Sequence, residues 1–227
     1  MTQVRTLAAY EIVRHLFPRP PPTEIDEIAR ATGKAIDSAL AYWSHAQRQN
    51  LRLTATAVQK MALGTLNEEL QDADVTPSPE ARTKAEREIA GVLQAFRKSE
   101  VFGLARPRSR LVLIDRTVGV YAQPDFSDGV RRFYEMKTFR AVPPPPDVAL
   151  QVSIFQLAFP EQRSFLACFD RHKDPVETCI EEVPPPTAEA RTALLRQMRE
   201  IGLLKGIEKV LEYIDTQVVG YTLEGTP

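Results

Sequence analysis

The sequence is poor in the residues that build soft-metal and disulfide-rich sites. Its 227 residues include only two cysteines, Cys168 and Cys179, and three histidines, which are scattered at positions 15, 45 and 172. Two cysteines are too few for a disulfide framework, or for a zinc or iron–sulfur site with four thiolate ligands within the chain. Any metal is therefore expected to be a hard cation held by carboxylates.

The sequence also lacks a long apolar run and a large net charge. No stretch approaches the ~20 apolar residues that span a bilayer, and the first 17 residues lack the small-residue cleavage site of a signal peptide. We therefore expect no membrane partner, and a cytoplasmic location is the default. The formal net charge of −1, with 43% hydrophobic and 26% charged residues, is that of an ordinary globular protein. This length predicts one domain over residues 1–227.

The near-zero net charge conceals an uneven distribution of arginine. The chain has 21 arginines against eight lysines, with clusters at 106–110 (RPRSR), at 131–132 and at 171–173 (RHK). Around one site, such clusters would form a phosphate-binding rim, and DNA binding would then weaken steeply with salt. The candidate DNA contacts are Arg106, Arg108, Arg110, Arg131 and Arg132. Solvated surface is the alternative interpretation of each cluster.

The predicted order of elements is helices, hairpin, helix, hairpin, helix. Apolar spacing and capping residues predict helices over residues 4–17, 24–50, 51–70, 79–98, 148–159 and 188–215, with Thr23, Ser78, Asp147 and Thr187 as N-terminal caps. β-branched and aromatic residues predict hairpins that pair 109–126 with 130–139 and 163–170 with 176–183. The second hairpin should place Cys168 opposite Cys179.

An acid and a base stand two positions apart on the predicted return strand, in the run PDFSDGVRRFYEMK. On a strand, Glu135 and Lys137 would point to the same face, and Met136 would point to the other. Asp125 ends the preceding strand, so the hairpin should bring its carboxylate close to Glu135. Two carboxylates can bind a divalent ion, while an ammonium group stabilises an activated water or the charge that develops on a phosphate. The pattern therefore predicts hydrolysis of phosphodiesters.

Each of these residues also has an ordinary structural interpretation. Asp125 can be a turn residue at the end of a strand, and Glu135 with Lys137 can be an exposed ion pair. Asp115 and Asp128 compete with Asp125, although a mid-strand position and a turn position suit metal bridging less well.

The pattern of Asp125 followed by Glu135 and Lys137 resembles that of the PD-(D/E)XK nucleases. Two further motifs resemble the RecB-type exonuclease branch, which includes CRISPR-adaptation exonucleases. A Gln-x-x-x-Tyr helix is matched by Gln151 to Phe155, and an upstream Gly-x-x-x-His motif by Gly33 to Asp37. The resemblance spans roughly residues 24–180.

The sequence departs from this family at two positions. Phe155 lacks the hydroxyl of the family tyrosine, and Asp37 replaces a histidine that ligates metal. A carboxylate can still bind Mg²⁺ or Mn²⁺. Asp37 and Gln151 can alternatively be polar residues on exposed helix faces. The iron–sulfur cysteines of several relatives are absent, so no cluster is expected.

The resemblance implies an α/β fold of the restriction-endonuclease type, with a small mixed sheet, flanking helices and a helical subregion at about 45–98. It implies a Mg²⁺- or Mn²⁺-dependent deoxyribonuclease that acts from DNA ends or on single strands. Asp125, Glu135, Lys137 and Gln151 would be catalytic. The metal ligands would be Asp37, Asp125, Glu135 and the backbone carbonyl of Met136. A homo-oligomer or a protein partner remains open, and the alternative function is a non-catalytic nucleic-acid-binding or assembly subunit with a degenerate nuclease fold.

Overall fold

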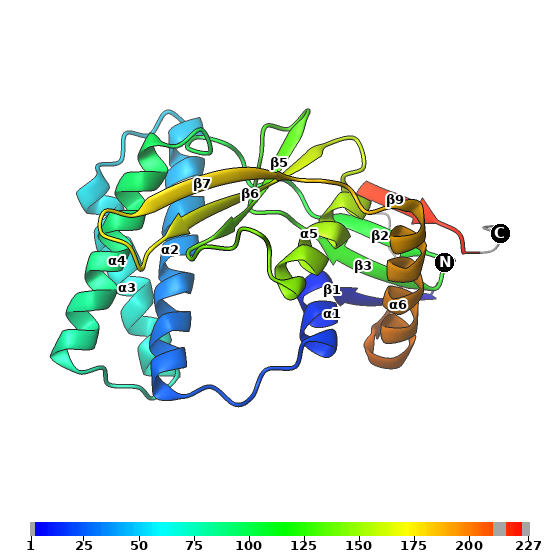
Figure 1. Cartoon of the computed structure of the whole chain (residues 1–227), viewed down its shortest axis with the longest axis horizontal. Coiled ribbons are helices and arrows are strands. Elements are labelled where there is room, and N and C mark those ends of the chain that lie inside the picture. The colour runs from blue at the N-terminus through cyan, green and yellow to red at the C-terminus, as the bar shows by residue number, and fades with distance from the viewer. Residues whose placement is uncertain (1–2, 211–216, 224–227) are drawn as a thin grey trace.

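The chain folds into two β-sheets that are flanked by helices (Figure 1). The computed structural model describes residues 3–210 and 217–223. Its helices are α1 (Ala9–Leu16), α2 (Glu24–Arg48), α3 (Ala55–Asp72), α4 (Pro79–Lys98), α5 (Pro146–Ala158) and α6 (Ala188–Lys205). Its strands are β1 (Gln3–Ala8), β2 (Arg110–Ile114), β3 (Val118–Ala122), β4 (Phe126–Ser127), β5 (Arg132–Lys137), β6 (Arg163–Asp170), β7 (Glu177–Val183), β8 (Ile207–Val210) and β9 (Gln217–Tyr221). The mixed α/β class predicted from the sequence is confirmed.

The strands form two mixed sheets, where the sequence predicted one. The five-stranded sheet has the order β8-β1-β3-β2-β9, and the four-stranded sheet has the order β4-β5-β6-β7. The chain passes from the first sheet to the second between Ala122 and Phe126. Pro124 lies in this passage and has no N–H to donate, which prevents one continuous strand. The expected strand over 109–126 is therefore wrong.

A tight turn between β2 and β3 also interrupts the strand that the sequence predicted over residues 109–126. β2 and β3 pair as an antiparallel hairpin, and its turn contains Asp115 and Arg116, whose φ angles are 46° and 55°. Non-glycine residues rarely adopt this left-handed region, so composition gave no turn signal here. Asp115 is a turn residue and not the mid-strand residue that the sequence predicted. Its carboxylate lies 3.1 Å from Arg199 and accepts the N–H of Leu223.

Both ends of the chain contain strands where the sequence predicted helix. Residues 4–8 belong to β1, which pairs in parallel with β3, and the first helix begins only at Ala9. The last helix ends at Lys205, because Gly206 leaves the helical conformation and the following residues join β1 as β8. Ile207, which falls within the predicted helix 188–215, is an exposed strand residue. The rest of the predicted helix, 211–215, lies outside the described residues.

The predicted helix caps are confirmed with one exception. Thr23, Ser78 and Thr187 each accept the backbone N–H three residues further on. Helix α5, however, begins at Pro146 after Pro145, so Asp147 lies in its first turn and does not cap it. Proline suits the first helical position because its missing N–H would have no partner there.

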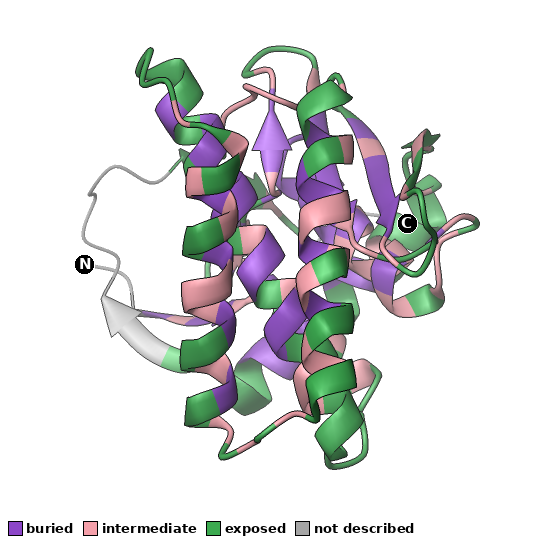
Figure 2. Cartoon of the chain, turned by 90° about the vertical axis from the view of Figure 1, so that its left-hand side faces the viewer, coloured by how far each residue is buried: buried purple, intermediate pink, exposed green. Residues whose placement is uncertain are grey.

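Each sheet has its own hydrophobic cluster. Helices α2, α3 and α4 bury their inner faces against the four-stranded sheet (Figure 2), with Leu40, Leu66 and Phe96 fully enclosed. Helices α1, α5 and α6 enclose the second cluster, which includes Val120 of β3 and Phe155 of α5. Burying such a side chain stabilises the fold by about 1.5–3 kcal/mol. The two clusters meet at β5, which separates α5 from α2–α4.

The β6–β7 hairpin has the predicted register. Cys168 lies directly opposite Cys179 in the antiparallel pairing, as the equal spacing of the two residues from the turn predicted. β6 also pairs in parallel with β5, where Lys137 lies opposite Cys168. Helix α5 joins β5 to β6 as the crossover of this parallel pair.

Candidate active site

The alternation of β5 separates packing residues from charged residues. Tyr134 and Met136 are buried on the side of α2–α4, as predicted for Met136. Glu135 and Lys137 therefore point to the opposite side, toward α5. The Lys137 Nζ donates to Glu135 Oε1 at 2.6 Å and to Gln151 Oε1 on α5 at 3.1 Å. The structure thus brings together three of the predicted catalytic residues.

Asp125 joins this group from the passage between the two sheets. Its Oδ2 accepts the backbone N–H of Met136 at 2.8 Å, which fixes the carboxylate beside β5. Burial and the negative charge of Glu135 raise the pKa of Asp125 to about 7, although Lys137 opposes this shift. The Asp125 carboxylate therefore lies close enough to Glu135 for their charges to interact, as the sequence predicted. Asp125 does not end a long strand, however, because it immediately precedes the two-residue strand β4.

Asp37 on α2 lies within electrostatic reach of the same group. Burial and repulsion by Asp125 raise the pKa of Asp37 to about 6, while Arg106 and Lys137 oppose the shift. Asp37 is half-buried, which is not the environment of a fully solvated helix face. The structure therefore brings Asp37, which stands where the family that the sequence resembles has a histidine, within electrostatic reach of Asp125 and Lys137.

Glu135 has one oxygen that nothing in the described protein satisfies. Its side chain is only 4% exposed. Oε1 receives Lys137, whereas Oε2 is buried without a hydrogen-bond partner among the described residues. An unpaired buried carboxylate oxygen carries a desolvation penalty, so such an atom calls for an explanation.

The three carboxylates nevertheless do not form a closed metal cage. Within residues 3–210 and 217–223, no three histidine, cysteine, aspartate or glutamate side chains are grouped so that they could hold a metal ion. Asp125 faces the N–H of Met136, and Glu135 faces Lys137. One oxygen of Asp125 and one oxygen of Glu135 are thus already hydrogen-bonded within the protein, and only their other oxygens are left for a metal ion.

The charge of Lys137 is stabilised by this environment. Burial alone would lower its pKa, but the charges of Glu135 and Asp125 raise it. Lys137 therefore carries a permanent positive charge at neutral pH.

Phe155 and Gly33, one residue from each of the two further motifs, have different surroundings. Phe155 is buried in the second cluster, where its ring centroid lies 6.4 Å from that of Phe133 in an edge-to-face contact. It has no polar function there. Gly33, in contrast, lies next to Arg171, whose guanidinium would be 3.7 Å from a Cβ at this position.

Two of the arginines that the sequence predicts to contact DNA form ion pairs within the protein. Arg110 pairs with Glu161 at 2.7 Å and stacks over the Phe159 ring at 4.2 Å. Arg132 pairs with Asp128 at 3.2 Å. Arg106, Arg108 and Arg131 are exposed, and only Arg106 contributes to the electrostatics of Asp37 and Asp125.

Asp128 has a structural role in the turn before β5. Its Oδ1 accepts three backbone N–H groups, from residues 130, 131 and 132, at 2.7–3.0 Å. Although burial would raise the pKa of Asp128, these N–H groups lower it to about 2. Asp128 therefore does not compete with Asp125 for a role in the site.

Sequence reasoning missed a row of cations on α4. Lys84, Arg87 and Lys98 line a groove between α4 and the β6–β7 hairpin. Their spacing along one helix face was a visible signal, but they are scattered along the sequence and form no contiguous basic cluster.

Comparison with known proteins gives no family. No family model and no curated protein matches the chain. Among solved structures, the chain is similar to one described as "Crystal structure of SSO0001", with 12% identity over 86% of this chain and 83% of the other, and a TM-score of 0.36. This likeness is too weak to carry an argument. Within the described residues, no helix is long and apolar enough to cross a membrane.

Proposed function

We propose that this chain is a metal-dependent nuclease that hydrolyses phosphodiester bonds of DNA, from an end or on single strands. The observation that carries the proposal is the unpaired buried oxygen of Glu135, next to the Asp125 carboxylate and the Lys137 ammonium. The unsatisfied oxygen of Glu135 and the repulsion between the Glu135 and Asp125 carboxylates both lower the stability of the folded chain. A divalent cation would relieve both costs.

The residues fit a hard divalent ion by their chemistry. Asp125, Glu135, Asp37 and the carbonyl of Met136 supply only oxygen atoms, which are the ligands that Mg²⁺ and Mn²⁺ prefer. When bound, the ion would supply a Lewis acid that polarises the phosphate. The raised pKa values of Asp37 and Asp125 also predict that the ion competes with protons for this site.

Lys137 supplies the positive charge that the reaction needs beside the phosphate. Glu135 and Gln151 hold its ammonium group in one position through two hydrogen bonds. A fixed cation stabilises the charge that develops in the transition state without reorganisation at the moment of reaction. Gln151 is a positioning residue in this scheme, because it acts through Lys137.

A second candidate is a non-catalytic DNA-binding or assembly subunit with a degenerate site. The open arrangement of the carboxylates and the apolar surroundings of Phe155 favour this candidate. An intact group of Asp125, Glu135, Lys137 and Gln151 favours the enzyme, because a site without function has no reason to retain an orphaned carboxylate oxygen.

Cleavage of end-labelled DNA tests the proposal. Single-stranded and duplex substrates are incubated with the wild type and with Glu135→Gln at increasing Mg²⁺ or Mn²⁺. We expect cleavage that requires the metal and is lost in Glu135→Gln. Salt-sensitive DNA retention without cleavage at any metal concentration would establish the second candidate and overturn the first.

A further inference from the structure

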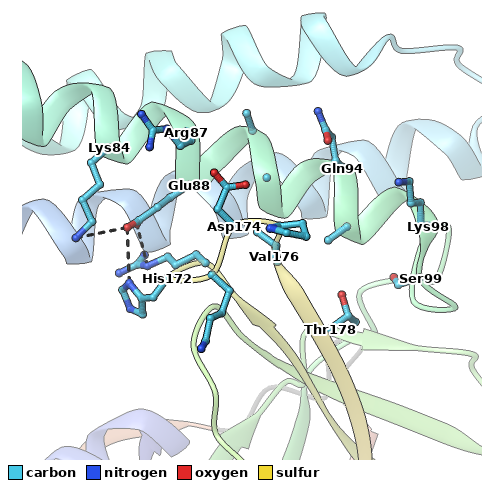
Figure 3. Close-up of a pocket in the computed structure, with 16 residues that line it drawn as sticks. Lys84, Arg87, Glu88, Gln94, Lys98, Ser99, His172, Asp174, Val176 and Thr178 are labelled. Atoms are coloured by element: carbon cyan, nitrogen blue, oxygen red, sulfur yellow. Dashed lines mark ion pairs between the residues drawn. The ribbon is translucent and has the colours of Figure 1, made fainter.

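A groove of about 650 Å³ runs between α4 and the turn of the β6–β7 hairpin (Figure 3). Gly91 allows this close approach, because a Cβ at this position would lie 2.8 Å from the Val176 side chain. The groove has six basic lining residues, Lys84, Arg87, Lys98, Arg171, His172 and Lys173, against two acidic ones, Glu88 and Asp174. With histidine neutral, five positive and two negative groups leave a local charge of +3 in a chain whose net charge is −1.

Some of the basic residues that line the groove already contact an acidic residue of the protein, Glu88. Glu88 lies 3.2 Å from Arg171, 3.6 Å from His172 and 3.9 Å from Lys84 (Figure 3). Arg171 is nearly buried and also donates to the carbonyl of Ala29 on α2. Arg171 therefore anchors the hairpin to the helices and is not available to a ligand.

Three cations remain available to a ligand. Arg87, Lys98 and Lys173 have no carboxylate partner in the described part of the chain. Lys84 and Lys98 stand 14 residues apart on one helix, so the groove extends for about 21 Å. A single phosphate ion cannot contact cations spread over this length, whereas a polyanion can.

The chemistry of the lining decides which polyanion fits. No phenylalanine, tyrosine or tryptophan lines the groove, and its one aromatic ring, the His172 imidazole, lies against Glu88, so the groove offers little platform on which unpaired bases could stack. Gln94, Ser99 and Thr178 add neutral polar groups of the kind that contact phosphate and sugar. These features suit a backbone whose bases are turned away, as in a duplex. One strand of a duplex presents a phosphate every ~3.4 Å, or about six along the groove.

We propose that this groove binds the sugar–phosphate backbone of duplex DNA without reading its sequence. The choice of DNA rests on the proposed function. The hairpin links the groove to the candidate site, since the N–H of Arg171 donates to the carbonyl of Thr138, directly after Lys137. The groove holds paired DNA beside the strand that carries the catalytic residues, and so sets the substrate class of the site as DNA that contains a duplex segment.

The test is a binding measurement on matched charge variants. Wild type is compared with Arg87→Gln/Lys98→Gln/Lys173→Gln. The control variant is Arg48→Gln/Lys60→Gln/Arg196→Gln, which removes three exposed cations outside the groove. Fluorescence anisotropy of a labelled duplex is recorded in EDTA over a range of salt, so that cleavage plays no part. Circular dichroism confirms that each variant is folded.

We expect the groove variant to bind the duplex roughly 10²-fold more weakly at 0.1 M salt. Its slope of log K against log[salt] should be smaller by about 2.7, which is 0.9 for each phosphate that is no longer neutralised. The control variant should keep most of the wild-type slope. Equal weakening in both variants would show a general charge effect and overturn the proposal. So would absence of duplex binding by the wild type.

Competitors distinguish the other possible occupants. Single-stranded DNA, poly-glutamate and vesicles containing phosphatidylserine are each added to the preformed duplex complex. Weak competition by all three supports the proposal, and stronger binding of any of them than of the duplex overturns it. Because these measurements need no metal, their failure leaves the cleavage proposal intact, and a failure to cleave DNA leaves duplex binding intact.

Discussion

Two nearly buried glutamates in neighbouring parts of the molecule have opposite surroundings. Glu88 in the groove has two cationic neighbours, Arg171 and Lys84, and lies 3.6 Å from the imidazole of His172. Glu135 has one, Lys137, together with the negative charge of Asp125 and an oxygen without a partner in the described protein. The comparison shows that this fold can neutralise a buried acid with its own side chains. At Glu135 it does so only in part, and the proposal of a bound cation rests on this difference.

The largest expected effect is on catalysis at Lys137. Lys137→Ala should reduce the cleavage rate by about 10²–10³-fold, as the loss of one fixed group that stabilises the transition state does elsewhere. Binding of Mn²⁺ and of DNA should change little, because the ammonium group acts mainly on the attacking water and the transition state. Single-turnover cleavage and anisotropy measure the two properties separately. Lys60→Ala serves as the control, and an unchanged cleavage rate in Lys137→Ala would contradict the assignment.

The same substitution should destabilise the protein to very different extents at the two glutamates. Glu88→Gln should lower the free energy of unfolding by about 3–5 kcal/mol, because it leaves the buried guanidinium of Arg171 without a counter-charge. Glu135→Gln should be far less destabilising in metal-free protein, because it removes repulsion with Asp125. Urea denaturation in EDTA compares them. A larger loss in Glu135→Gln than in Glu88→Gln would mean that Glu135 is the better satisfied acid.

Substitution of Asp37 should weaken metal binding more than it lowers the stability of the fold. Asp37→Ala should raise the Mn²⁺ concentration for half-maximal cleavage by at least about 10-fold, a change typical of weakened metal sites. Excess Mn²⁺ should restore part of the activity. Asp37→His should keep a midpoint near that of the wild type, because imidazole can also ligate Mn²⁺. An unaltered midpoint in Asp37→Ala would leave Asp125 and Glu135 as the only carboxylate ligands.

The smallest expected effect is a dependence of stability on pH. The pKa of Asp37 is raised to about 6 and that of Asp125 to about 7. Between pH 4 and pH 7 the unfolded chain therefore releases protons that the folded chain retains, and the free energy of unfolding falls as the pH rises. The fall in unfolding temperature over this range should be smaller in Asp37→Asn than in the wild type.

Divalent metal provides the control for this measurement. Mn²⁺ should oppose the fall in the wild type, because it stabilises the ionised carboxylates. Identical pH profiles for the wild type and Asp37→Asn, each in EDTA, would show that the Asp37 carboxyl does not titrate with a raised pKa.

The sequence predicted local features well and long-range pairing poorly. Helix caps at Thr23 and Ser78, and the register of Cys168 against Cys179, depend on neighbouring residues or on one turn, and they are confirmed. The two sheets, and the strand β1 at the start of the chain, depend on pairing between segments more than 100 residues apart. Hydrophobic spacing within a short window cannot reveal such pairing, because a short apolar run suits either a strand or a helix.

The candidate site shows the same division. Glu135 and Lys137 were predicted together from their spacing on a strand, whereas Gln151 was predicted from the resemblance to a family helix. That Glu135 would retain an unpaired oxygen follows only from its surroundings in the folded protein. The pairing of Glu88 depends on Arg171 and His172, which arrive from a distant hairpin. No pattern in the sequence indicates that contact.

The segment between Ala122 and Phe126 connects the two sheets and carries Asp125 of the candidate site. Asp125 stands on a short link whose two ends belong to different sheets, and one hydrogen bond ties it to Met136. Glu135 and Lys137, in contrast, belong to a single strand and move as one body. A rotation of one sheet against the other would therefore be taken up by residues 123–125, and Glu135 and Lys137 would stay in register. The spacing of Asp125 from Glu135 would be kept only while the hydrogen bond to Met136 holds.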